Sequence, residues 1–233
     1  MSVVNLVGSS QINTNEITVG WVDGGTVEGK FTQGLLEVLM TCPLPLQHYL
    51  RIQGCVIAAN RGHLLSIWYN QSYTDWLLWV DSDIVLNSEA ILKLRESIDP
   101  VNKPIITGTY FLPSFGDKLR PIVIPALFTE SSDGKHELYP LKDLPEDTLI
   151  EVDSAGFGFV LMHRSAITKM IEHHGDINFF APKAGIVNPN AEDFCFFENA
   201  KEAGIPLYAH TGAIVDHIKK VPIDLAYYQL HKE

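Results

Sequence analysis

The residues best suited to chemistry in this chain are two aspartates, Asp81 and Asp83, separated by Ser82. They directly follow the uninterrupted apolar run of residues 76–80. Such a run is typical of a strand covered on both faces, and ligands of such sheets bind beyond the carboxyl ends of the strands. In an extended segment, side chains two residues apart point the same way, so we expect Asp81 and Asp83 to converge on one divalent cation. The alternative is a surface turn in which the two aspartates only cap the backbone around Ser82.

The composition of the chain limits the class of protein that carries this pair. Of its 233 residues, 46% are hydrophobic and 19% are charged, as in a soluble globular protein. The formal net charge of −11 argues against binding by neutralisation of many phosphates, so nucleic acid is not an expected partner, although acidity alone does not exclude it. We expect no membrane span, no signal peptide and a cytoplasmic protein. The three cysteines, Cys42, Cys55 and Cys195, are far apart in the sequence and should be reduced.

Hydrophobic patterns along the chain predict an alternating series of strands and helices. They predict strands near residues 17–22, 50–59 (bent at Gly54), 76–80, 105–110, 121–128 and 206–210. They predict helices near residues 31–42, 64–68, 88–98, 164–171 and 192–203, after an uneven lead-in or edge segment at residues 1–16. We therefore predict the α/β class: a single three-layer domain over residues 1–233, with a mostly parallel, mixed central sheet.

Four ordered stretches resemble the family 2-type glycosyltransferases, which have the nucleotide-sugar-binding GT-A fold. These stretches are Asn60-Arg61, Asp81-Ser82-Asp83, Gly156-Phe157-Gly158 with the following apolar run before Arg164-Ser165, and Glu192-Asp193 with the downstream His217. Their order and spacing agree with that family over about residues 17–218, and the ordered set is more specific than any one motif.

The resemblance implies a metal-dependent hexosyltransferase. Such an enzyme moves a sugar from a nucleotide-diphosphate sugar, UDP-type rather than GDP-type, to a hydroxyl of an unknown glycan or other acceptor. Residues 17–110 would form the half that binds the nucleotide sugar and the metal, residues 111–218 the acceptor-side half, and residues 219–233 a C-terminal tail.

The metal ligands implied by the resemblance are Asp81, Asp83 and His217. They would hold a divalent cation on the diphosphate, where it stabilises the charge of the departing nucleotide. Carboxylates alone suit Mg²⁺, whereas an added imidazole nitrogen favours Mn²⁺. Asp81 could instead reach the metal through water or bind the ribose, and His217 could be a core histidine hydrogen-bonded beside Asp216.

The expected contacts to the nucleotide sugar come from several loops. These candidates are Trp21, Asp23, Arg61, Asp81, Ser82, Gly156, Phe157 and Gly158. Trp21 could stack on a base or belong to the core, and Arg61 could pair with phosphate or be a surface arginine at a helix start. The two glycines of residues 156–158 could let the backbone approach the sugar or could serve a tight turn that needs glycine dihedrals.

The candidate catalytic carboxylates are Asp193, as general base for an inverting transfer, and its neighbour Glu192. The alternative is ordinary acidity at a helix N-terminus, and in a retaining enzyme Asp193 would instead hold sugar hydroxyls. Two other functions stay open. A nucleotidyltransferase of the same fold would need a basic first loop, where this chain has only Lys30. A protein that binds nucleotide sugars or carbohydrate without turnover would not need Asp193.

Overall fold

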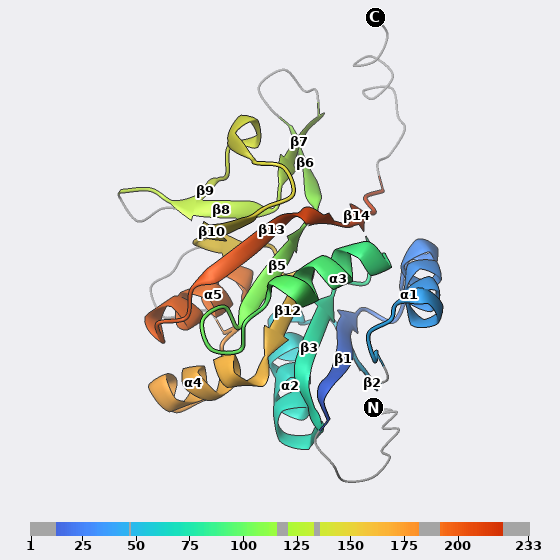
Figure 1. The fold of residues 1–233 in the computed structure, drawn as a ribbon, viewed down its shortest axis with the longest axis vertical. Helices are drawn as coiled ribbons and strands as arrows, with labels where there is room; N and C mark the ends of the chain where they lie inside the picture. Colours follow the sequence, from blue (N-terminus) through green and yellow to red (C-terminus); the bar gives the residue numbers. More distant parts are fainter. Residues whose placement is uncertain (1–12, 47, 116–120, 133–135, 182–191, 221–233) are drawn as a thin grey trace, which may run out of the picture.

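A seven-stranded sheet forms the centre of the fold (Figure 1). The structure is a computed structural model that describes residues 13–46, 48–115, 121–132, 136–181 and 192–220. In spatial order the strands are β10 (Leu149–Val152), β13 (Leu207–Ile214), β5 (Ile105–Thr109), β12 (Phe159–His163), β3 (Thr74–Val80), β1 (Asn13–Asp23) and β2 (His48–Gln53). Strands β10 and β12 run antiparallel to their neighbours, and the remaining strands are mutually parallel. The predicted α/β class with a mostly parallel, mixed sheet is confirmed.

Helices cover both faces of this sheet and give it three layers. Those in the described residues are α1 (Gly29–Thr41), α2 (Ile57–Gln71), α3 (Ser88–Ser97), α4 (Arg164–His174) and α5 (Glu192–Glu202). The alternation of side chains along β3 shows the two faces, because Leu77 and Trp79 pack with residues of α2, α4 and α5. Their neighbours Leu78 and Val80 pack with residues of α1 and α3. The apolar run that predicted a strand covered on both faces therefore does form one.

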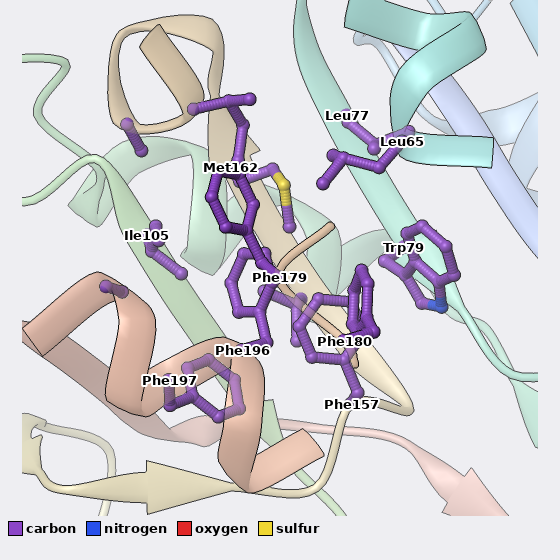
Figure 2. Close-up of a cluster of buried hydrophobic side chains, with 14 of the residues drawn as sticks. Leu65, Leu77, Trp79, Ile105, Phe157, Met162, Phe179, Phe180, Phe196 and Phe197 are labelled. Atoms are coloured by element: carbon purple, nitrogen blue, oxygen red, sulfur yellow. The ribbon is translucent and has the colours of Figure 1, made fainter. Parts of the chain in front are cut away.

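An aromatic cluster fixes the second half of the chain against β3 (Figure 2). The ring of Phe157 is fully buried and lies 4.8 Å from the ring of Phe196, 4.9 Å from that of Phe180 and 5.2 Å from that of Trp79. Buried aromatic pairs of this kind contribute about 0.5–1.5 kcal/mol each beyond the area they bury. The cluster thus holds the 156–158 segment and the start of α5 in a fixed relation to the end of β3.

Three smaller sheets accompany the central sheet in the described residues. They are β4 (Ile84–Val85) with β14 (Asp216–His217), β6 (Phe111–Phe115) with β7 (Pro121–Pro125), and β8 (Leu127–Glu130) between β9 (His136–Leu138) and β11 (Ser154–Ala155). A short 3₁₀ helix spans Leu141–Asp143. In the β4–β14 pair, His217 lies opposite Ile84, which places its imidazole beside Asp83.

The boundaries differ most from the sequence-based prediction at three places. The strand predicted over residues 50–59 ends at Gln53, and its apolar second part starts α2, where the Asn60 N–H donates to the Val56 carbonyl at 3.0 Å. The strand predicted over 121–128 is divided between β7 and β8. Residues 13–16 of the expected lead-in belong to β1, whereas residues 1–12 and 221–233 lie outside the described residues.

The composition also led us to expect reduced cysteines and no membrane span. None of the three cysteines forms a disulfide; Cys195 is buried in α5 and Cys55 is exposed. Within the described ranges, no helix combines the length and the apolar character that crossing a bilayer requires.

Candidate functional site

The acidic Asp81-Ser82-Asp83 segment is a turn rather than an extended end of β3. The strand ends at Val80, and the Ile84 N–H donates to the Asp81 carbonyl at 3.0 Å, which closes a four-residue turn. The Asp81 N–H donates to the Gly158 carbonyl at 2.9 Å. Our expectation that Asp81 and Asp83 share one direction in an extended segment is therefore wrong, because the turn gives each carboxylate its own partners.

Asp81 faces a buried arginine. The Arg61 side chain is only 2% exposed, and its Nη2 donates to the two carboxylate oxygens of Asp81 at 3.1 and 3.3 Å. Its Nη1 pairs with Asp193 and lies 3.6 Å from the Glu192 carboxylate. One guanidinium thus serves three carboxylates, and we call Arg61 with Asp81, Glu192 and Asp193 the arginine cluster. A buried charge of this kind is costly to leave unpaired.

Asp193 is held on both of its carboxylate oxygens. Oδ1 pairs with Arg61, and Oδ2 accepts the Phe157 N–H at 3.1 Å. Asp193 and Glu192 stand in the first turn of α5, where the helix dipole favours negative charge. The Arg61 guanidinium also lies 5.2 Å from the centre of the Phe157 ring. Phe157 therefore faces the arginine cluster with both its backbone N–H and its buried ring.

Asp83 has a different set of partners, which we call the histidine cluster: Asp83, His217 and Lys219. The Asp83 Oδ2 atom lies 3.2 Å from His217 Nε2 and 2.8 Å from Lys219 Nζ. His217 Nδ1 lies 3.1 Å from the Phe111 carbonyl oxygen, which can only accept a hydrogen bond. In the neutral imidazole this contact places the proton on Nδ1, so Nε2 and Asp83 Oδ2 are two acceptors that face each other. Such a pair requires a proton or a metal cation between its members.

The ionisation of Asp83 suits that arrangement. Burial raises the pKa of this carboxyl, but the hydrogen bond from His217, which requires a proton on Nε2, and the hydrogen bond from Lys219 more than offset the effect and lower the pKa to about 2. Asp83 is therefore ionised at neutral pH, as a carboxylate that binds a metal must be.

A cleft of about 420 Å³ opens at the carboxyl ends of β1 and β3. Its lining consists of Val22, Thr26, Glu28, Ile57, Asp81, Ser82, Asp83 and Lys219. The volume is in the range of small-molecule sites, about 300–1,000 Å³. The cleft also lies beyond strand ends, where ligands of open α/β sheets bind. Asp81 and Asp83 thus border one cleft even though they do not share a partner.

Asp23 and Trp21 lie at the end of β1 beside this cleft. Asp23 is 6% exposed and accepts two hydrogen bonds from Arg51, at 2.6 and 2.8 Å, and one from the Gly25 N–H at 2.7 Å. The hydrogen bond from Arg51 is the main cause that lowers the pKa of Asp23. Trp21 donates from Nε1 to Asp23 at 3.2 Å and packs on Phe31. No motif indicated Arg51; only its register opposite Trp21 in the β1–β2 pair could have suggested it.

Gly156 and Gly158 are glycines for a steric reason. The described glycines with positive φ are Gly25, Gly175 and Gly204, so neither residue of this loop needs glycine dihedrals. A Cβ atom on Gly156 would lie 2.0 Å from the Tyr110 hydroxyl oxygen, and one on Gly158 would lie 2.9 Å from Tyr110 Cζ. The two glycines therefore make room for Tyr110, a residue that the sequence analysis did not select.

The structure brings the predicted site residues together in two neighbouring clusters rather than one. Arg61, Asp81, Glu192 and Asp193 form the first, and Asp83 with His217 forms the second. Within the residues that the structure describes, no three His, Cys, Asp or Glu side chains form a group able to hold a metal by themselves.

Comparisons with known proteins find likeness only at the level of structure. No family model matches the sequence, and no curated protein matches it. Among solved structures, A197 from STIV matches at 18% identity over 87% of this chain and 86% of that chain, with a TM-score of 0.48. GalNAc-T7, crystallised with UDP, GalNAc and Mn²⁺, matches at 11% identity over 91% of this chain and 45% of its own, with a TM-score of 0.49.

A third match is 4-diphosphocytidyl-2C-methyl-D-erythritol synthase, at 13% identity over 94% of this chain and 99% of that chain, with a TM-score of 0.45. At such low identities and TM-scores, these likenesses do not indicate an activity for this chain.

Proposed function

We propose that this chain is a metal-dependent glycosyltransferase, which transfers a sugar from a nucleotide-diphosphate sugar to a hydroxyl group of a glycan or other acceptor. The observation that carries the proposal is the histidine cluster at the rim of the cleft, where His217 Nε2 lies 3.2 Å from Asp83 Oδ2. The ordered motifs of the sequence add to it, and they favour a UDP-type donor.

The residues of the histidine cluster fit a divalent cation that a substrate completes. Mg²⁺ is usually held by one or two carboxylates together with substrate phosphates, so a protein-only group of three ligands is not required. Asp83 and His217 would hold the cation directly, and the imidazole favours Mn²⁺ over Mg²⁺. Asp81, which already pairs with Arg61, would reach it only through water. When bound, the cation would offset the negative charge that develops on the departing nucleoside diphosphate.

Other residues of the cleft would orient the donor. Lys219 lines the cleft and its side chain is 43% exposed, so its ammonium group can turn from Asp83 to a phosphate oxygen. The Ser82 and Thr26 hydroxyls line the same cleft and suit hydroxyl groups of the ribose or sugar. Asp23 is already bonded to Arg51 and Gly25, so the proposal gives Asp23 and Trp21 the role of shaping the nucleoside end of the cleft.

Asp193 is the proposed base for the acceptor hydroxyl. Its two carboxylate oxygens pair with Arg61 and the Phe157 N–H, so one of these partners must yield when Asp193 takes a proton. This pairing also favours a second candidate function, a protein that binds nucleotide sugars or carbohydrate without turnover, because such a protein needs no base.

Thermal melting with nucleotides tests the donor site. We expect UDP or GDP to raise the melting temperature only with Mn²⁺; at a hundredfold excess over Kd the stabilisation is about 2.7 kcal/mol, or roughly 5–10 °C for a chain of this size. Asp83→Asn should abolish this shift. Asp99→Asn, in the loop before the amino end of β5 and outside the cleft lining, is the matched control and should keep it. A shift that survives in Asp83→Asn, or no shift with any nucleotide, contradicts the proposal.

Hydrolysis or transfer of the donor separates the two candidate functions. Loss of a general base lowers turnover by about 10²- to 10⁴-fold, so Asp193→Asn should lose turnover and keep the Mn²⁺-dependent melting shift. A wild-type protein that shows the shift but turns over no donor, with a panel of sugar acceptors present, would instead be the binding protein.

A further inference from the structure

Tyr110 lies between the arginine cluster and the histidine cluster. It directly follows β5 and is 5% exposed. The ring of Tyr110 meets the His217 imidazole edge to face, with the ring centres 5.0 Å apart and the planes at 80°. Because His217 Nδ1 is also fixed by the Phe111 carbonyl, the Tyr110 ring is the second restraint on the orientation of the imidazole.

The hydroxyl end of Tyr110 contacts the other cluster through the backbone. The Gly158 N–H donates to the Tyr110 hydroxyl oxygen at 3.3 Å, and the Gly158 carbonyl accepts the Asp81 N–H at 2.9 Å. The neighbouring Phe157 N–H donates to Asp193. The 156–158 segment, which lies against Tyr110 closely enough to exclude side chains at both glycines, therefore connects Tyr110 to the two aspartates of the arginine cluster.

The charges around the Tyr110 hydroxyl agree with its position between the two clusters. Burial raises the pKa of Tyr110 and nearby Asp81 and Asp83 raise it further, while Arg61 partly opposes them. The hydroxyl therefore stays protonated and lies within the field of both clusters. Among the described residues, its only hydrogen-bond partner is the Gly158 N–H, so its own proton is not committed to a protein acceptor.

We propose that Tyr110 is a positioning residue that couples the two clusters: its ring orients His217, and its hydroxyl sets the 156–158 segment and, through it, Asp81 and Asp193. The effect of this coupling on sugar transfer rests on the proposed function. It assigns the two ends of one side chain to two different steps, donor binding for the ring and transfer for the hydroxyl.

The kinetic test uses two substitutions that remove these ends separately. Tyr110→Phe keeps the ring but leaves the buried Gly158 N–H without its partner, so the melting temperature should fall somewhat. We expect kcat to fall about tenfold, within the roughly 10²-fold that a misplaced reacting group can cost, while the donor KM stays near the wild-type value. Tyr110→Leu also removes the support of His217; loss of a residue that orients a metal ligand costs about 10- to 100-fold in metal affinity. That variant should therefore show a raised donor KM and weaker Mn²⁺ binding as well.

Tyr69→Phe is the matched control, because the Tyr69 hydroxyl forms a hydrogen bond with Thr168 at 3.1 Å, away from both clusters. It should keep wild-type kcat and KM. The proposal is overturned if Tyr110→Phe keeps wild-type kcat, if it raises KM as strongly as Tyr110→Leu, or if Tyr69→Phe loses as much activity.

NMR separates a failure of this inference from a failure of the proposed function. Even without any turnover, Tyr110→Phe should move the amide signals of Gly158, Phe157 and Asp81 and leave the His217 ring signals in place, whereas Tyr110→Leu should move both sets. If wild-type protein turns over no donor but these shifts appear, the coupling stands and the glycosyltransferase proposal fails. If Tyr110→Phe leaves the Gly158 and Asp81 amides unmoved, the coupling is overturned.

Discussion

Asp81 and Asp83 are two residues apart, yet their surroundings differ in almost every physical respect. Asp81 faces Arg61, whose side chain is 2% exposed and which also pairs with Asp193. Asp83 faces Lys219, whose side chain is 43% exposed, and an imidazole nitrogen that in the neutral ring is another acceptor. Asp81 thus has a buried protein cation as its partner, although Arg61 is shared among three carboxylates. Asp83 instead has an exposed protein cation, and it faces an acceptor nitrogen of the neutral imidazole, where the proposed function would place a metal cation. In the proposed function, one pair of carboxylates would therefore serve two purposes, structural order at Asp81 and ligand binding at Asp83.

The largest effect that this comparison predicts follows from removing Arg61. Arg61→Met leaves three carboxylates around a buried position without their cation, and breaking a buried pair costs about 3–5 kcal/mol. We expect that loss in the free energy of unfolding, measured by urea denaturation at pH 7. The control is Lys201→Met, which also removes a cation from two carboxylates, Glu130 and Asp153, but at a side chain that is 56% exposed.

Exposed ion pairs are worth about 0.2–1 kcal/mol, so the Lys201→Met control should lose little stability. Equal losses in the two variants would mean that Arg61 is not the structural centre of the site.

Gly156→Ala is expected to have the next largest effect, because its Cβ atom would lie 2.0 Å from the Tyr110 hydroxyl oxygen. Overpacking of a filled site costs about 1–3 kcal/mol, which should appear as a lower urea midpoint. Gly24→Ala is the control, since a Cβ atom there meets nothing within 4 Å. Adding Tyr110→Phe removes the atom in closest contact and should restore part of the loss. If it restores none, the clash with Tyr110 does not explain the glycine.

Much of the fold could be predicted from the sequence because its signals are local. The apolar run of residues 76–80 indicated a strand covered on both faces, and β3 is one. The boundary between β2 and α2 could not be read in the same way, since a short apolar run such as residues 55–59 suits either a strand or the first turn of a helix.

The site was less predictable because its partners are set by tertiary structure. Spacing identified the carboxylates but gave the turn at Ser82 only as the alternative to an extended end. It also gave Arg61 a surface or phosphate role, although the side chain is buried among acids. Tyr110 carried no signal beyond its place as the last residue of a predicted strand, because its role depends on the loop at 156–158 that packs on it.

Asp23 offers a smaller, pH-dependent test of another carboxylate that an arginine of the protein already pairs. The Arg51 hydrogen bond lowers its folded pKa below the model-peptide value of 3.8. The stabilisation is therefore fully present above about pH 4–5 and is lost as the pH falls through the folded pKa. Asp23→Asn should lose about 2 kcal/mol at pH 6, the value of a strong charged hydrogen bond.

The measurement for Asp23 is the urea midpoint of both proteins at pH 6, 4 and 3. The difference between wild type and Asp23→Asn should shrink as the pH falls. A difference that stays constant over this range would show that the ionised carboxylate is not what stabilises the end of β1.

The smallest expected effect concerns Asp83 and its exposed partner Lys219. Lys219→Gln removes the exposed ammonium group from Asp83, and such pairs contribute about 0.2–1 kcal/mol, less at high salt. We expect the free energy of unfolding to change by that amount at low salt and to match wild type in 1 M NaCl. A loss as large as that of Arg61→Met would mean that Asp83 also depends on a protein cation for folding. A small loss means that the charge on Asp83 is tolerated by the fold itself, which leaves it available to a bound cation.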